Sequence, residues 1–189
     1  MKPVRSISGY LSEMATVIML LLAFRVVPPQ KHVVGEKFGG GVVFFVSEDG
    51  NHGLICSPEN QSTDMQWFNG VNKITGTGKE GMDNGAKNTD TIISKQTPDN
   101  PTGKFAAKLC ADYSITVDGK TYDDWYLPSK HELNLLFLVQ SKVADFDDRY
   151  FWSSNELNDE LAWIQSFYDG RQLDVSKHYG NYVRAVRSF

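Results

Sequence analysis

Short blocks of apolar and polar residues alternate along this chain. The run Val42 to Val46 is rich in β-branched and aromatic residues, which favours a buried strand. The turn Asp49-Gly50-Asn51 separates it from a second apolar run at 53–56, so the two runs predict a β-hairpin. Between Thr75 and Asn100 apolar residues become sparse. We expect a long surface loop there, with one helical turn near 88–94.

Two helices are predicted in the middle of the chain. The first follows Asn100-Pro101, because Asn is a favoured N-cap and Pro is favoured at the first helical position. Its apolar face consists of Phe105, Ala106, Leu109 and Cys110. The second helix begins at Ser129, where Ser129 and Glu132 have the spacing of a capping box.

The remaining pattern indicates strands. The segments 115–117 and 120–122 flank Asp118-Gly119, a pair typical of a type I′ hairpin turn. Four further strands are expected at 150–154, 162–168, 172–175 and 181–186. Strands that come first, two helices in the middle and a final meander predict an α+β fold with an antiparallel sheet.

The N-terminal segment differs from the rest. Residues 14–24 are apolar except for Thr16, and Lys2 and Arg5 precede them, which is the layout of a secretory signal. No clear cleavage motif follows, so a wrongly assigned start or a buried helix stays an alternative. We interpret 1–33 as a leader with a Pro-rich linker and 34–189 as one domain. The expected location is extracellular, periplasmic or at the cell surface. We expect the chain to meet a membrane only during export or through the leader segment.

Composition narrows the function classes. The 189 residues carry a net charge of −4, which argues against a nucleic-acid partner. Two cysteines are too few for a disulfide framework or a finger-type zinc site. No run of 20 apolar residues is present, so an ordinary membrane span is not expected.

An ordered set of short motifs runs through 34–189. The motifs are Gly39-Gly40-Gly41-Val42-Val43-Phe44, His52-Gly53-Leu54-Ile55, Asp124-Trp125-Tyr126-Leu127-Pro128-Ser129 with Glu132-Leu133, Phe151-Trp152-Ser153-Ser154, Ala162-Trp163, Asp169-Gly170 and Tyr182-Val183-Arg184-Ala185-Val186-Arg187. In order and spacing this set resembles the Lcl C-terminal domain family, named after a Legionella collagen-like adhesin. The resemblance implies a C-type-lectin-like fold, with two helices packed on antiparallel β-sheets and long irregular loops.

The resemblance also implies a function. The family is similar in fold to formylglycine-generating enzymes and to hypervariable ligand-binding proteins, its members are mostly exported, and the named adhesin binds sulfated polysaccharide. We therefore expect a non-catalytic, adhesin-like binding module that recognises a glycan or a surface protein. Many relatives have a Cys where this chain has Ala185, and that Cys could pair with the one matched by Cys110. Here only Cys56 is left as a partner, and whether the two pair stays open.

Candidate ligand residues follow from the same resemblance, because the hypervariable relatives bind ligand through the stretch that matches 155–181. They are Asn155, Glu156, Gln165, Tyr168, Arg171, Asp174, His178 and Tyr179. Aromatic and adaptable polar side chains of this kind suit recognition. Trp67 lies beside a predicted loop and is the tryptophan we expect to be open for stacking on a sugar ring. We expect Trp125, Trp152 and Trp163 in the core.

Metal and anion sites are less well indicated. An oxygen-rich loop contains Asn155, Glu156, Asn158, Asp159 and Glu160. A comparable loop of C-type lectins holds calcium, but this chain lacks the lectin signatures, so we expect no cofactor and keep calcium as the alternative to a solvated turn. Arg184 and Arg187 could bind an anion, and internal pairing with Glu132 or Asp124 is the favoured interpretation. The acidic group Asp145, Asp147 and Asp148 is expected to be a solvated surface.

Two other function classes stay open as alternatives. An enzyme related to the formylglycine-generating proteins would need a reactive thiol, whereas Cys110 lies on an apolar face where a thiol is inert. No G-x-S-x-G motif is present, and the four histidines are scattered. The other alternative is a structural cell-envelope domain without a specific ligand.

Overall fold

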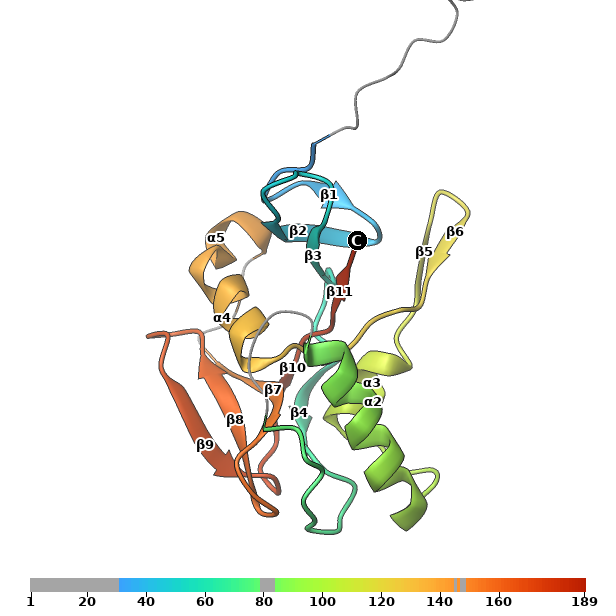
Figure 1. Ribbon diagram of the computed structural model, residues 1–189, viewed down its shortest axis with the longest axis vertical. Helices are drawn as coiled ribbons and strands as arrows, with labels where there is room; N and C mark the ends of the chain where they lie inside the picture. The colour runs from blue at the N-terminus through green and yellow to red at the C-terminus, as the bar shows by residue number, and fades with distance from the viewer. Residues whose placement is uncertain (1–30, 79–83, 145, 147–148) are drawn as a thin grey trace, which may run out of the picture. The chain divides into compact units, whose positions relative to one another are not determined.

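Strands form where the apolar runs predict them, and the fold is α+β (Figure 1). The computed structural model describes residues 31–78, 84–144, 146 and 149–189. Most of the predicted leader and the acidic group Asp145, Asp147 and Asp148 lie outside these residues. No helix within the described ranges is both long and apolar enough to span a bilayer.

A four-stranded sheet joins the two ends of the described chain. Its order is β1 (Lys37–Phe38), β2 (Gly41–Val46), β3 (Gly53–Cys56) and β11 (Val186–Ser188), and all its pairs are antiparallel. The β2–β3 hairpin confirms the sequence prediction. Its turn is closed by Asp49, whose carboxylate accepts a hydrogen bond of 2.9 Å from the backbone N–H of Asn51.

A five-stranded sheet carries most of the C-terminal third. Its order is β4 (Ser62–Met65), β10 (Asn181–Val183), β7 (Tyr150–Glu156), β8 (Leu161–Ser166) and β9 (Gln172–Ser176). The pair β10–β7 is parallel, so the expectation of a purely antiparallel sheet is wrong at this one position. A separate hairpin, β5 (Ile115–Val117) with β6 (Lys120–Tyr122), turns through Asp118 and Gly119, both at positive φ, as predicted.

The predicted last strand, 181–186, is two strands in different sheets. The break lies at Arg184-Ala185, where the Arg184 guanidinium donates 2.8 Å hydrogen bonds to Asn60 Oδ1 and to the carbonyl of Ser57. Among the described residues, the hydrogen-bond partners of Arg184 are thus an amide and a backbone carbonyl, where the sequence predicted a carboxylate such as Glu132 or Asp124. Arg187 does pair as predicted, because its Nε and Nη2 lie 2.5 and 2.8 Å from the Asp124 carboxylate. The terminal segment thus ties the two sheets together.

Four α-helices are present among the described residues, whereas the sequence predicted two. The segment expected to be a loop with one helical turn contains α2 (Asn84–Gln96), followed by the short helix η1 (Thr97–Asp99). The helix expected after Asn100-Pro101 starts five residues later, as α3 (Ala106–Ala111). α4 (Lys130–Leu138) has the predicted capping box, and α5 (Gln140–Val143) follows it.

The core consists of two apolar clusters on either side of β7. Phe151 points into the cluster that contains Leu133 and Leu136 of α4, and Trp152 points into the cluster that contains Ile92 of α2. This division follows from the alternation of side chains along a strand. In Figure 1 the helices α4 and α5 lie on one side of β7, and α2 and α3 lie on the other.

Candidate functional site

A buried ion pair lies where β7 and β9 end. Lys177 Nζ is 2.8 Å from Glu156 Oε2, and the exposed fractions of the two side chains are 0% and 4%. Lys177 Nζ also donates to the carbonyls of Asn158 (2.8 Å) and Lys73 (3.3 Å) and lies 4.5 Å from the centre of the Trp67 ring. Burial lowers the pKa of Lys177, although the hydrogen bond and charge of Glu156 act in the opposite direction.

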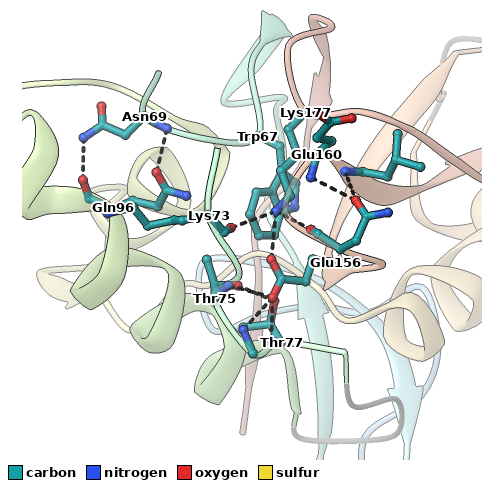
Figure 2. Close-up of polar contacts among 12 residues, drawn as sticks. Trp67, Asn69, Lys73, Thr75, Thr77, Gln96, Glu156, Glu160 and Lys177 are labelled. Atoms are coloured by element: carbon teal, nitrogen blue, oxygen red, sulfur yellow. Dashed lines mark hydrogen bonds and ion pairs between the residues drawn. The ribbon is translucent and has the colours of Figure 1, made fainter. Parts of the chain in front are cut away.

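The other carboxylate oxygen of Glu156 is held by backbone. The N–H groups of Thr75, Gly76 and Thr77 donate to Oε1 over 2.7, 2.5 and 3.3 Å, as Figure 2 shows. Successive N–H groups that converge on one oxygen form an anion-binding nest. The nest and the ion pair together fix the segment 73–77 against the ends of β7 and β9. This arrangement supports the surface around it. Glu156 Oε1 is engaged by three backbone donors rather than by a ligand.

Four predicted ligand residues are therefore buried supports. Trp67 is fully buried, and its Nε1 donates a 2.8 Å hydrogen bond to the carbonyl of Ser153. Asn155 is buried and accepts a 2.8 Å hydrogen bond from the first N–H of α4, at Lys130. Glu156 and Gln165 are also buried. The expectation that the Trp67 ring is open at the surface is wrong, and each of these four side chains has a hydrogen-bond partner inside the fold.

The oxygen-rich loop after β7 does not gather its oxygens around one point. Glu156 faces Lys177, and Asn158 Oδ1 accepts hydrogen bonds of 2.9 and 2.8 Å from the N–H groups of Glu160 and Leu161. In the part of the chain that the structure describes, no three His, Cys, Asp or Glu residues are grouped so that they could hold a metal ion.

The five remaining predicted residues are exposed but do not form one patch. Tyr168 and Arg171 lie in the turn before β9, Asp174 lies within β9, and His178 and Tyr179 follow it. A strand of this length separates its two ends by roughly 15 Å. The Arg171 side chain already forms an ion pair, because its Nε lies 2.6 Å from the Asp169 carboxylate in the same turn.

A polar hollow lies at the end of β9 where the strand begins, next to the β8–β9 turn. It has a volume of about 280 Å³ and is lined by Lys130, His131, Asn134, Gly170 and Gln172; we call it the α4–β9 hollow. Lys130 is the first residue of α4, which the capping box places there, and His131 and Asn134 lie on the same helix. Gly170 is required in the turn, because φ is +79° and a side chain would meet the ring of Phe137.

The wall of the hollow formed by β9 is held in place by an amide ladder. Gln172 Nε2 donates to Gln165 Oε1 (2.7 Å) and to the carbonyl of Lys130 (2.8 Å). Gln165 Nε2 in turn donates to the carbonyl of Gly170 over 2.7 Å. The buried Gln165 therefore fixes the orientation of Gln172, which is the preorganisation that a binding site needs.

An aromatic ring lies beside the ladder. Trp163 pairs with Asp174, and Gln165 pairs with Gln172, so these four side chains share one face of the β8–β9 ribbon. Trp163 is partly exposed, and Lys130 Nζ lies 3.7 Å from the centre of its ring. The sequence prediction for these two tryptophans is therefore wrong. Trp67, which was expected to be open, is in the core, and Trp163, which was expected in the core, is partly exposed. Trp125 and Trp152 are buried, as predicted.

Sequence reasoning missed Lys130, Asn134 and Trp163 as candidates. The capping box at Ser129 and the tight turn at Asp169-Gly170 were both recognised, and together they predict that the start of α4 and the β8–β9 turn are well defined. What could not be read from the sequence is that β8 and β9 pass under the start of α4.

The two cysteines are free and fully buried, in different apolar clusters. Burial raises the pKa of Cys56 to about 11 and raises the pKa of Cys110 further above its ordinary value. A thiol in such surroundings stays protonated and is a poor nucleophile.

No family model matches this chain. No curated protein matches it at a significant level either.

Proposed function

We propose that this chain is a non-catalytic, exported binding module, related to the Lcl C-terminal domain family, that recognises a glycan at the α4–β9 hollow. The observation that carries the proposal is the amide ladder of Gln165 and Gln172 beside the partly exposed Trp163. Sugars present hydroxyl groups, which need oriented polar partners, and apolar ring faces, which stack on aromatic side chains. Gln172 lines the hollow, and Trp163 lies next to it, in contact with Lys130, which also lines the hollow.

The C-type-lectin-like fold is part of this proposal. Helices packed against mainly antiparallel sheets support it, as does the long irregular segment 66–78 that follows β4. We prefer binding to catalysis because an enzyme of the formylglycine-generating type requires a reactive thiol. The pKa of both cysteines is raised by burial, which favours the unreactive thiol form.

The test is a glycan array probed with the full chain, followed by titration of the strongest glycan. Gln172→Ala removes the oriented amide, and Trp163→Ala removes the aromatic face. We expect each variant to bind at least about tenfold more weakly, which corresponds to a loss of about 1.4 kcal/mol. Tyr179→Ala, at the other end of β9, is the control and should bind as the wild type does.

Melting curves of the three variants exclude unfolding as the cause of weaker binding. The proposal fails if no glycan on the array binds, or if the Gln172 and Trp163 variants bind a glycan as tightly as the wild type. Export is tested separately, by fractionating cells that express the full chain. Retention of the whole protein in the cytoplasm would contradict that part of the proposal.

A further inference from the structure

Several large apolar side chains are exposed on the loops around the buried ion pair. Ile74 is 67% exposed, Tyr179 63%, Leu157 51% and Val71 46%. We define the loop end as the described loop residues 70–78, 156–160 and 178–180. We propose that the loop end is a docking surface for a basic segment of a partner protein. It lies at the opposite end of β9 from the α4–β9 hollow, so this inference does not depend on glycan binding.

These loops are far apart in sequence and meet in space. Ile74 lies between Lys73, whose carbonyl accepts from Lys177 Nζ, and Thr75, whose N–H donates to Glu156. Leu157 directly follows Glu156. Tyr179 lies two residues after Lys177, and the neighbouring His178 ring packs on Phe68 at 4.4 Å. In Figure 1 the coloured part of the loop that follows β4 gathers with the β7–β8 and β9–β10 connections at one end of the domain, away from β1 and the β5–β6 hairpin.

The loops are fixed before any partner binds. A buried ion pair is seldom more stabilising than apolar residues of the same volume, so stability alone does not account for Glu156 and Lys177. What the pair provides here is geometry, because it holds three loops together through six hydrogen bonds. A surface that is already ordered loses little conformational entropy when it binds. Apolar side chains that gather on such a surface, unlike single scattered ones, are typical of interaction sites.

Charge identifies the kind of partner. Asp159 and Glu160 are exposed next to Leu157, and the exposed Asp64 lies directly against Gly180. The lysine among the described residues of the loop end, Lys73, is engaged with Asp99, and Lys177, which directly precedes 178–180, is engaged with Glu156. The apolar side chains are therefore bordered by negative charge. A basic segment with apolar side chains complements this surface, whereas an anionic membrane or a second copy of the same loop end would be repelled.

The experiment uses a displayed library of random twelve-residue peptides, panned against the immobilised full chain. We expect selected peptides to combine Lys or Arg with aliphatic or aromatic residues. The double variant Ile74→Ser/Leu157→Ser should weaken their binding at least tenfold. Asp159→Asn/Glu160→Gln should weaken it severalfold and reduce its dependence on salt. Tyr168→Ser removes an equally exposed side chain at the other end of β9 and should change nothing.

Three results of the peptide experiment would overturn the proposal. They are the absence of any enriched peptide, selected peptides without basic residues, and equal binding of the peptides to the Ile74→Ser/Leu157→Ser variant. Binding of the full chain to neutral phosphatidylcholine vesicles that this variant loses would assign the surface to lipid and also reject a protein partner. Glycan binding at the α4–β9 hollow, measured on the same variants, should be unchanged, so failure of one proposal is distinguishable from failure of the other.

Discussion

Replacing Lys177 by Met tests how much the fold depends on its buried ion pair. Methionine keeps most of the alkyl volume against Trp67 but removes the ammonium group. The Glu156 carboxylate then stays buried with its three backbone donors and without its counter-charge, while the carbonyls of Lys73 and Asn158 lose a donor. Breaking one side of a buried pair typically costs 3–5 kcal/mol, and the remaining nest offsets part of this. We expect the free energy of unfolding to fall by about 3 kcal/mol.

Urea denaturation of the full chain measures this change, with Lys108→Met as the matched control. Lys108 pairs with Asp112 on the surface of α3, where such a pair contributes at most about 0.5 kcal/mol. The double variant Lys177→Met/Glu156→Gln keeps an acceptor for the backbone donors and removes the uncompensated charge, so it should recover at least about 1 kcal/mol. A loss below about 1 kcal/mol for Lys177→Met, or a double variant less stable than the single one, would refute the reasoning.

Three further predictions follow from other parts of the molecule. Gly170→Ala and Gly119→Ala both place an alanine at φ +79°, but only at position 170 would the new methyl group lie 2.6 Å from a carbon of Phe137. Gly170→Ala should therefore lower the free energy of unfolding, measured in urea, by at least about 1 kcal/mol more than Gly119→Ala does. Equal losses for the two variants would contradict this. Hydrogen bonding to Arg187 lowers the pKa of Asp124 from its ordinary value of 3.8. The ionised carboxylate therefore stabilises the folded state at pH values above 3.8, and this stabilisation is lost as the pH falls through the lower pKa of the folded state. Asp124→Asn should therefore cost about 1 kcal/mol near neutral pH, and the two stability curves should converge well below pH 3.8; a constant difference would contradict the assignment. Both cysteines should resist Ellman's reagent in the native chain and react as two thiols in denaturant without reductant, and native reaction of either thiol would contradict their burial.

The elements that sequence predicts well are those with a local physical signal. The hairpin turn at Asp118-Gly119, the capping box at Ser129 and the β2–β3 hairpin all depend on residues within a few positions of one another. Only one turn of helix α2 was predicted, because its sequence, Asn84 to Gln96, is mostly polar and its helical state depends on tertiary packing. The parallel pair β10–β7 could not be predicted either, since it joins strands that are distant in the chain.

The candidate site was harder to predict because the exposure of a polar residue depends on what packs over it. Glu156 is a residue type that often binds ligands, and only the fold brings the segment 75–77 and Lys177 into contact with its carboxylate. The sequence places Trp67 beside a loop and Trp163 within a strand, yet Trp67 lies under Lys177 in the core and Trp163 is partly exposed beside Lys130. Neither difference is encoded in neighbouring residues.

The buried residues that sequence singled out still bear on recognition, one layer below the surface. Gln165 orients Gln172 at the α4–β9 hollow, and Glu156 holds the loops that expose Ile74 and Leu157. Substitution of a buried support should therefore lower stability and binding together. Substitution of an exposed residue such as Ile74 should lower binding alone, because most of its surface is already in contact with solvent in the folded chain. Comparing the two kinds of variant separates the residues that build a surface from those that a partner touches.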